Sequence, residues 1–114
     1  MLQKKRRQTR HLPAFILLAL AQEPRHGGAI HDALASRLPG LKIDTGAIYR
    51  ALKALEAEGA LSFVWDASAS GPARKIYHMT DKGWQSLASW KEEIENRREI
   101  LSDFLAAYAR LSRP

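Results

Sequence analysis

The sequence predicts a mainly α-helical domain that carries a two-stranded β-hairpin and continues into one long C-terminal helix. Three observations lead to this fold class. Apolar residues recur at helical spacing in three short segments between residues 12 and 58, and they alternate with other residues at 61–66. From residue 87 onward they follow a heptad pattern. A chain of 114 residues has room for one such domain and no second core.

The first two helices are short and closely joined. Pro13 suits the first turn of a helix that ends near Gln22, and the residues between them are apolar on nearly every side. This helix must therefore be covered on more than one side. Glu23-Pro24 ends it, and a second helix over residues 26–38 follows, with apolar residues at i, i+4 and i+8.

A third helix follows the Pro39-Gly40 turn, with Asp44 or Thr45 as its N-cap and Gly59 at its end. Its apolar side, which faces a core, consists of Ile48, Leu52 and Leu55. The opposite side carries Tyr49, Arg50 and Lys53. A solvated face usually mixes acidic with basic residues and needs no aromatic residue, whereas a surface that docks on phosphates has this composition. The alternative is an ordinary amphipathic helix with an isolated basic pair.

The period then changes to that of a β-hairpin. Residues 61–66 place Leu61, Phe63 and Trp65 on one face of a strand, and residues 74–79 supply its partner after a Gly-Pro loop. Thr80 caps the last helix, with Asp81 in its first turn, and this helix continues to about residue 110.

The last helix carries an apolar seam that a small domain cannot bury alone. Its two heptad positions hold Leu87, Ile94, Leu101 and Tyr108, and Trp90, Arg97, Phe104 and Leu111; only Arg97 is polar. We expect this seam, together with Phe15 of the first helix, to meet a second copy of the chain. The sequence therefore predicts a homodimer.

Charge is concentrated at the N-terminus. The net charge is +6, and the first eleven residues contain no acidic residue while carrying Lys4, Lys5, Arg6, Arg7 and Arg10. Such an arm usually is a solvated tail, and where it acts it binds nucleic acid or anionic lipid. The order of segments is a basic arm at 1–11, a domain of three helices and a hairpin at 12–79, and a dimerisation helix at 80–111.

The N-terminal region also imitates a secretory signal, because the basic segment precedes the apolar run LPAFILLALA. Removing that run would leave a hole in the domain, so we interpret it as the first helix. No apolar run reaches the length of a membrane span. The absence of cysteine fits a reducing compartment, and we expect a cytoplasmic protein.

The order of three helices, a two-stranded wing and a helix is that of the winged helix-turn-helix. Within that class the chain resembles the PadR family of transcriptional regulators, specifically its smaller subgroup with a single C-terminal helix. The resemblance rests on HGGAI at 26–30, TGAIYRALKALEAEGAL at 45–61 and GPARKIYHMTDKG at 71–83, and it covers residues 12–110. The chain departs from the family at Gly28, where an aromatic residue is common, and at Arg50, where proline is common.

The resemblance implies a sequence-specific DNA-binding regulator, typically a repressor on a palindromic operator. Thr45, Tyr49 and Lys53 match the DNA-contacting positions of the family, and Arg50 adds a charge to the same face. In the wing, Gly71 lets the backbone approach the duplex, while Arg74 and Lys75 supply positive charge to a phosphate. The alternative for these wing residues is that they form the solvent-exposed base of the hairpin and do not contact DNA. The alternative function is a winged-helix scaffold whose seam binds a different protein.

Trp90 is a candidate sensor, because an indole at a heptad position brings a broad flat surface to the seam. Small PadR regulators include members that bind planar drugs between paired tryptophans at the matching place, which implies an aromatic effector. The alternative is a core residue that packs on Phe15 or Ile16. The spacing of the histidines does not fit a metal site, so the sequence predicts no bound metal. It contains no catalytic motif and no cofactor-binding loop, so we expect neither an enzyme nor a cofactor.

Overall fold

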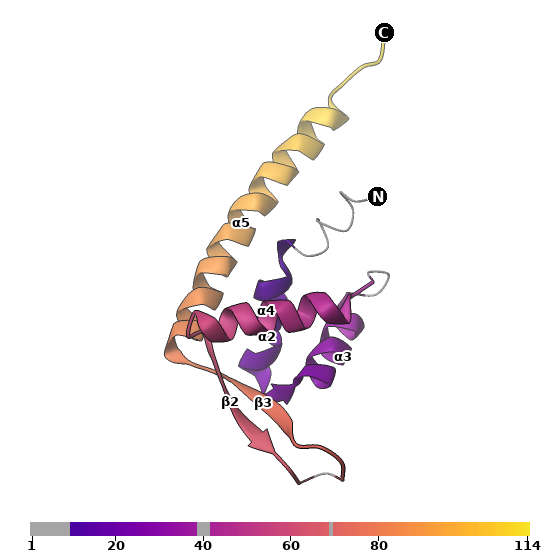
Figure 1. Ribbon diagram of the computed structural model, residues 1–114. Helices are drawn as coiled ribbons and strands as arrows, with labels where there is room; N and C mark the ends of the chain where they lie inside the picture. Colours follow the sequence, from indigo (N-terminus) through magenta and orange to yellow (C-terminus); the bar gives the residue numbers. More distant parts are fainter. Residues whose placement is uncertain (1–9, 39–41, 69) are drawn as a thin grey trace.

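The four predicted helices and the two strands of the predicted hairpin are present in the computed structural model (Figure 1). The structure describes residues 10–38, 42–68 and 70–114. Its elements are α2 (Leu12–Gln22), β1 (Arg25–His26), α3 (Gly27–Arg37), α4 (Thr45–Ala57), β2 (Leu61–Asp66), β3 (Arg74–Met79) and α5 (Asp81–Ala109). The predicted turn at Pro39-Gly40, and Lys4, Lys5, Arg6 and Arg7 of the arm, lie outside the described residues.

Side-chain caps fix where three of the helices begin. The Asp44 carboxylate accepts a hydrogen bond from the Gly46 amide at 3.1 Å, and the Thr80 hydroxyl accepts one from the Gly83 amide at 3.1 Å. His26 Nδ1 accepts one from the Ala29 amide at 3.3 Å. Each bond satisfies a backbone donor that has no partner within its helix. The predicted cap at Thr80 is confirmed, and of the two candidates Asp44 and Thr45, Asp44 is the cap of α4.

The sheet contains a third strand in addition to the predicted hairpin. Its order is β1-β3-β2, and both pairings are antiparallel. The chain leaves α2 in an extended conformation at Glu23 and runs beside β3, so that Arg25 faces Tyr77 and His26 faces Ile76. This two-residue strand joins the start of α3 to the wing.

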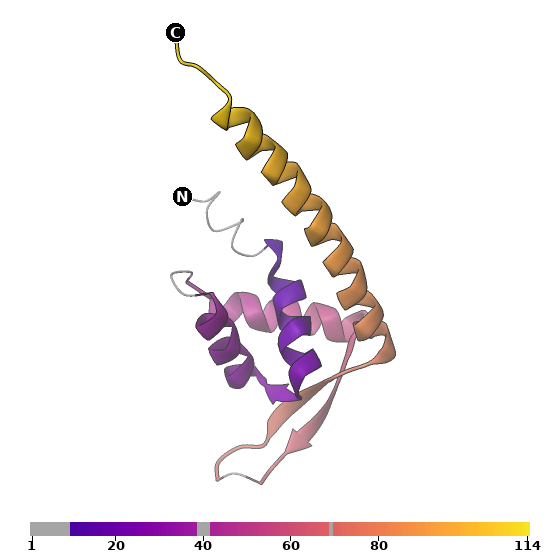
Figure 2. The ribbon, with the colours of Figure 1, turned by 180° about the vertical axis from the view of Figure 1, so that it is seen from behind.

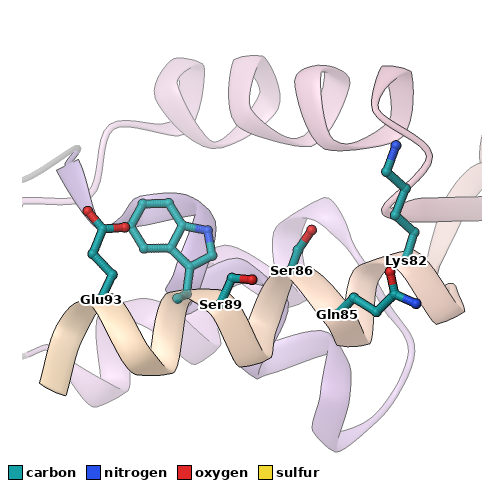
Figure 3. Close-up of a pocket in the computed structure, with 6 residues that line it drawn as sticks. Lys82, Gln85, Ser86, Ser89 and Glu93 are labelled. Carbon is teal, nitrogen blue, oxygen red and sulfur yellow. The ribbon is translucent and has the colours of Figure 1, made fainter. Parts of the chain in front are cut away.

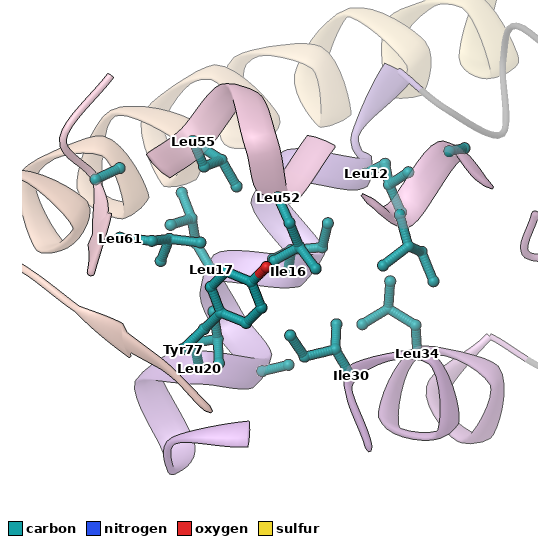
Figure 4. Packing of buried hydrophobic residues seen from close by; sticks show 14 residues of the cluster. Leu12, Ile16, Leu17, Leu20, Ile30, Leu34, Leu52, Leu55, Leu61 and Tyr77 are labelled. Carbon is teal, nitrogen blue, oxygen red and sulfur yellow. The ribbon is translucent and has the colours of Figure 1, made fainter. Parts of the chain in front are cut away.

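The core lies among α2, α3, α4 and the near end of the hairpin (Figure 4). Its largest fully buried side chains are Ile16, Leu17, Ile30, Leu34, Ile48 and Leu52. The prediction that α2 is covered on several sides is confirmed, because α3, α4, α5 and β3 all contact it. The predicted inward side of α4 is confirmed as well, since Ile48, Leu52 and Leu55 are buried.

α5 contacts the domain only through its first half. Beyond Arg97 every residue of the chain is exposed, and the helix extends away from the domain at the end opposite to the wing (Figures 1 and 2). The molecule is therefore elongated, with principal extents of 66 × 29 × 21 Å. Among the described residues, no helix has the length and apolar character needed to cross a membrane.

Candidate nucleic-acid interface

The outer side of α4 presents positive charge to solvent. Thr45 and Tyr49 are accessible there, and so are Arg50 and Lys53. The Arg50 guanidinium lies 3.6 Å from the Asp44 carboxylate, in an ion pair whose partners are 74% and 49% exposed. Pairs this exposed contribute little to stability, so Arg50 can leave Asp44 for another anion without a large cost. The four predicted residues of α4 thus share one accessible surface.

Tyr49 is held more firmly than its 50% exposure suggests. Its hydroxyl and ring edge lie against the backbone of Gly27, the first residue of α3. A side chain at position 27 would overlap the ring, so glycine is the residue that allows this approach. The sequence gives no sign of this contact, because it joins two helices across the fold.

The wing tip carries the second group of predicted residues. Gly71 has a φ of +102°, a backbone conformation that glycine adopts far more readily than other residues, and its Cα faces open space. Arg74 is exposed and lies opposite Asp66 in the strand register. Asp66 accepts hydrogen bonds from the Ser68 hydroxyl at 2.6 Å and the Ser68 amide at 2.9 Å. These two bonds lower the pKa of Asp66, so its carboxylate stays charged and holds the turn beside Arg74.

Lys75 points in a different direction from Arg74. Its ammonium lies 3.5 Å from the Glu56 carboxylate of α4 and 4.1 Å from the centre of the Phe63 ring. The Trp65 ring centre is 5.9 Å away. Lys75 is therefore already paired with an anion and two aromatic rings in the free protein. The sequence does not reveal this environment, because Glu56 and Lys75 belong to different elements.

A hollow of about 520 Å³ lies between the start of α3, α4 and β3. It is lined by His26, Gly27, Gly28, Tyr49, Arg74, Lys75 and Tyr77. Within the described part of the chain this lining holds two cations and no carboxylate, and the N-terminus of α3 adds the partial positive charge of its backbone amides. Gly28 has no side chain that could fill this space. Arg74 and the N-terminus of α3 therefore give this hollow positive charge, whereas the charge of Lys75 is paired with Glu56.

The predicted dimerisation residues divide into two groups. Phe15, Leu87 and Trp90 are partly buried and pack against the core. The others are exposed to at least 37%; they are Ile94, Leu101, Phe104 and Tyr108. The structure adds Ile100 and Leu105, which are 62% and 65% exposed and were not predicted. Beyond the break at Arg97, α5 therefore shows an apolar stripe to solvent along its second half.

Trp90 lies between two hollows on either flank of α5. On one flank an apolar groove of about 230 Å³ is lined by Phe15, Leu18, Leu87 and Ile94, among others. On the other flank a polar hollow of about 420 Å³ is lined by Lys82, Gln85, Ser86, Ser89 and Glu93 (Figure 3). The indole is also edge-on to the His11 ring, with 6.0 Å between ring centres. Trp90 thus packs against the core and at the same time borders solvent-accessible space.

The sequence and the fold of this chain are similar to those of known proteins. Residues 16–89 match the transcriptional regulator PadR-like family. A PadR-like transcription factor from Bacteroides fragilis is 32% identical, with a TM-score of 0.64 over 88% of this chain and 99% of that one. A PadR-like transcriptional regulator from Bacillus cereus is 28% identical, with a TM-score of 0.71 over 83% and 91%.

A PadR family transcription regulator from hypervirulent Clostridium difficile is 26% identical, with a TM-score of 0.72 over 83% of this chain and 98% of that one. These three proteins are similar to the chain along almost their entire lengths. Among curated proteins, none matches the chain significantly.

Proposed function

Since this chain belongs to the PadR-like family of transcriptional regulators, we propose that it is a homodimeric repressor that binds a palindromic operator. The observation that carries the proposal is the accessible positive side of α4, on which Arg50 and Lys53 lie beside Tyr49. Family and structural neighbours are regulators of transcription and not enzymes. Repression would follow from occupancy of a promoter by the bound dimer.

We assign α4 to the major groove as the recognition helix. Arg50 and Lys53 have the length and charge to reach a guanine edge or a phosphate, and Tyr49 can contact a thymine methyl group or the backbone. Thr45 offers a hydroxyl at the positive end of the helix dipole, where a phosphate is favoured. Arg74 and the N-terminus of α3, which border the hollow behind Tyr49, offer positive charge to a neighbouring phosphate. Arg74 and the Gly71 turn would then lie along the adjacent backbone or minor groove.

Dimerisation through α5 gives the operator its symmetry. The exposed apolar side chains of α5 gain free energy when they leave water, and a second copy offers the matching side chains. A two-fold dimer would place two α4 helices on half-sites about 34 Å apart, one helical turn of DNA. The partly buried residues Phe15, Leu87 and Trp90 would border the same interface.

We also propose that a planar aromatic effector binds beside Trp90 and relieves repression. Support comes from the position of the indole between the apolar groove and the polar hollow, both of which open to solvent. A ligand there would touch α2 and α5 and could alter how the two copies meet. It would change operator affinity only through unequal binding to the two dimer arrangements.

The direct test of the DNA interface compares alanine variants on an operator selected from random DNA by the protein. Arg50→Ala and Lys53→Ala should each cost about 1–3 kcal/mol of operator binding, whereas Arg74→Ala should weaken operator and random duplex alike. A reporter promoter that contains the operator tests repression. If neither α4 variant changes operator affinity, the groove assignment is wrong.

A further inference from the structure

Lys75 reaches from the wing to the recognition helix. In the strand register it lies opposite Trp65, and Phe63 lies opposite Tyr77, so these side chains share one face of the sheet. On that face the Lys75 ammonium is 4.1 Å from the Phe63 ring centre and 5.9 Å from the Trp65 ring centre. The same ammonium is 3.5 Å from the Glu56 carboxylate of α4. A single cation therefore connects the hairpin to the last turns of the helix.

The aromatic part of this cluster is itself ordered. The Phe63 and Trp65 rings are nearly perpendicular, at 87°, with centres 5.7 Å apart. Trp65 is nevertheless 63% exposed, so hydrophobic burial alone does not explain its position. Attraction between the ammonium and the ring faces does supply a reason for the arrangement.

Glu56 is half-buried beside the sheet. The Glu56 side chain is 32% exposed and that of Lys75 is 35% exposed, whereas the Arg50 and Asp44 side chains at the other end of α4 are 74% and 49% exposed. The ion pair with Lys75 places the Glu56 carboxylate on the same side of β3 as Tyr77. Burial raises the pKa of Tyr77, and the negative charge of Glu56 raises it further. The Lys75 charge is thus balanced inside the protein, and a DNA phosphate would have to compete with Glu56 for it.

We infer that Lys75 is a positioning residue that fixes the wing relative to α4, and that it sets operator discrimination without neutralising a DNA phosphate. We call Lys75, Glu56, Phe63 and Trp65 the wing latch. This inference rests on the proposed DNA-binding function and replaces the phosphate role that the sequence predicts for Lys75. The reason is geometric. The helix and the wing contact different parts of the duplex, so a fixed angle between them increases affinity for a specific site. Affinity for random DNA depends on charge alone.

The two roles of Lys75 make opposite predictions for Glu56. If Lys75 is part of the latch, removing either charge breaks the contact between the wing and α4. Glu56→Gln should then reduce operator affinity as much as Lys75→Met does. If Lys75 binds a phosphate, Glu56→Gln releases it for DNA and should strengthen binding. Lys75→Met suits the test because it keeps an unbranched side chain of similar length while removing the charge.

The experiment measures binding of labelled operator and random duplex by fluorescence anisotropy between about 50 and 200 mM salt, the range over which phosphate contacts change affinity steeply. The proteins are the wild type, Lys75→Met, Glu56→Gln, the double variant and Lys75→Arg. For the latch, each single variant should lose about tenfold in operator affinity, and the double variant no more than either, as expected for coupled residues. Random-duplex affinity should change far less than operator affinity, the salt slope of Lys75→Met should match that of the wild type, and Lys75→Arg should restore part of the operator affinity.

Arg74→Ala is the matched control, because it removes the adjacent wing cation, which is exposed. Its salt slope should fall by about 0.9, the value expected when one phosphate is no longer neutralised. A similar fall for Lys75→Met, or tighter binding by Glu56→Gln, would overturn the inference. The inference would also be overturned if the double variant lost as much operator affinity as the two single variants together.

A measurement without DNA separates failure of the latch from failure of the proposed function. In the free protein, the nuclear magnetic resonance signal of the Trp65 indole should shift in both Lys75→Met and Glu56→Gln, and shift less in Lys75→Arg. An unmoved signal refutes the contact itself. A wild-type protein that binds no duplex in a salt-sensitive way refutes the proposed DNA-binding function, and the operator role of the latch with it.

Discussion

The ring of Tyr49 in α4 rests on the backbone of Gly27 at the start of α3, so closely that a Cβ atom at position 27 would lie 2.5 Å from the Tyr49 hydroxyl oxygen. The first helix of the helix-turn-helix therefore supports the aromatic side chain of the second. Because the Tyr49 ring lies against Gly27, the side chain cannot rotate toward α3. This contact orients the aromatic residue of the proposed DNA face before any DNA is bound.

Gly27→Ala should weaken operator binding by displacing Tyr49. Overpacking of this kind costs about 1–3 kcal/mol, and the exposed ring can escape by rotating away from α3. We therefore expect a larger loss in operator affinity than in the free energy of unfolding. Anisotropy titration and chemical denaturation measure the two quantities on the same preparation.

Gly28→Ala is the control for that substitution. Its added Cβ would meet only the side chain of His26, at 3.3 Å, and His26 is partly exposed and can shift slightly. Operator affinity should stay close to that of the wild type. Equal losses for the two variants would show that the start of α3, and not the Tyr49 contact, is responsible.

Gly83→Ala should destabilise the whole fold. The Cα of Gly83 packs directly on the carbonyl oxygen of Ala60, and the same carbonyl accepts a hydrogen bond from the Thr80 amide at 3.2 Å. A methyl group at 83 must push the first turn of α5 away from the hairpin, at about 1–3 kcal/mol, which exceeds the gain in helix propensity of up to about 1 kcal/mol. Thermal unfolding should show a lower Tm, while Gln85→Ala, on an exposed position of α5, should change it little.

Local signals were sufficient to predict most of the fold. Asp44 and Thr80 are caps that act within three residues, and the change from helical to alternating spacing marks β2 without any knowledge of its partner. β1 could not be predicted, because two residues show no period and pair only where β3 happens to lie beside them. Its existence depends on the path of the chain after Glu23, which is a property of the folded domain.

The proposed site was less predictable than the fold. The exposure of Arg50 and Lys53 followed from the wheel of α4 alone. Lys75 looked equivalent to Arg74 in the sequence, yet neighbouring residues of a strand point to opposite faces, and only the register brings Lys75 to Glu56 and Trp65. Contacts between residues distant in the chain decide which cation is free.

Leu101→Glu should separate the proposed dimer. Leu101 is 61% exposed in the single chain and lies in the apolar stripe of α5, so a second copy would have to bury the added charge. Sedimentation velocity should show a shift from dimer toward monomer, with helix content retained. Ser102→Glu adds the same charge at the adjacent position, off the stripe, and should leave the dimer intact. A wild-type protein that sediments as a monomer at high concentration would contradict the assignment of α5.

Deletion of residues 1–9 should reduce DNA binding without changing its specificity. Four of the five basic residues of the arm are removed, and none of them has a predicted structural role. The slope of log affinity against log salt should flatten by about 0.9 for each phosphate that the arm no longer neutralises, with the ratio of operator to random affinity nearly kept. The thermal unfolding curve serves as the control and should not move. An unchanged slope would identify the arm as a solvated tail.

The effector proposal at Trp90 can be tested by fluorescence in a chain with a single tryptophan. In a Trp65→Phe, Trp84→Phe background, planar cationic or phenolic compounds that bind beside the indole should quench Trp90. The same compounds should weaken operator binding of the wild-type chain over the same concentration range, because one binding event would cause both effects. Affinity is measured on the wild type, since Trp65 belongs to the wing latch.

The control for that test is a Trp65→Phe, Trp90→Phe chain, in which Trp84 is the remaining tryptophan. Trp84 is 52% exposed on the same helix and lines neither hollow. Quenching of both single-tryptophan chains would indicate non-specific contact with the dye. The packing of Trp90 on the core and its edge contact with His11 favour a second role as an anchor for α5. If every planar compound leaves Trp90 unquenched and Trp90→Ala only unfolds the protein, anchoring is its sole role, and any effector must act elsewhere.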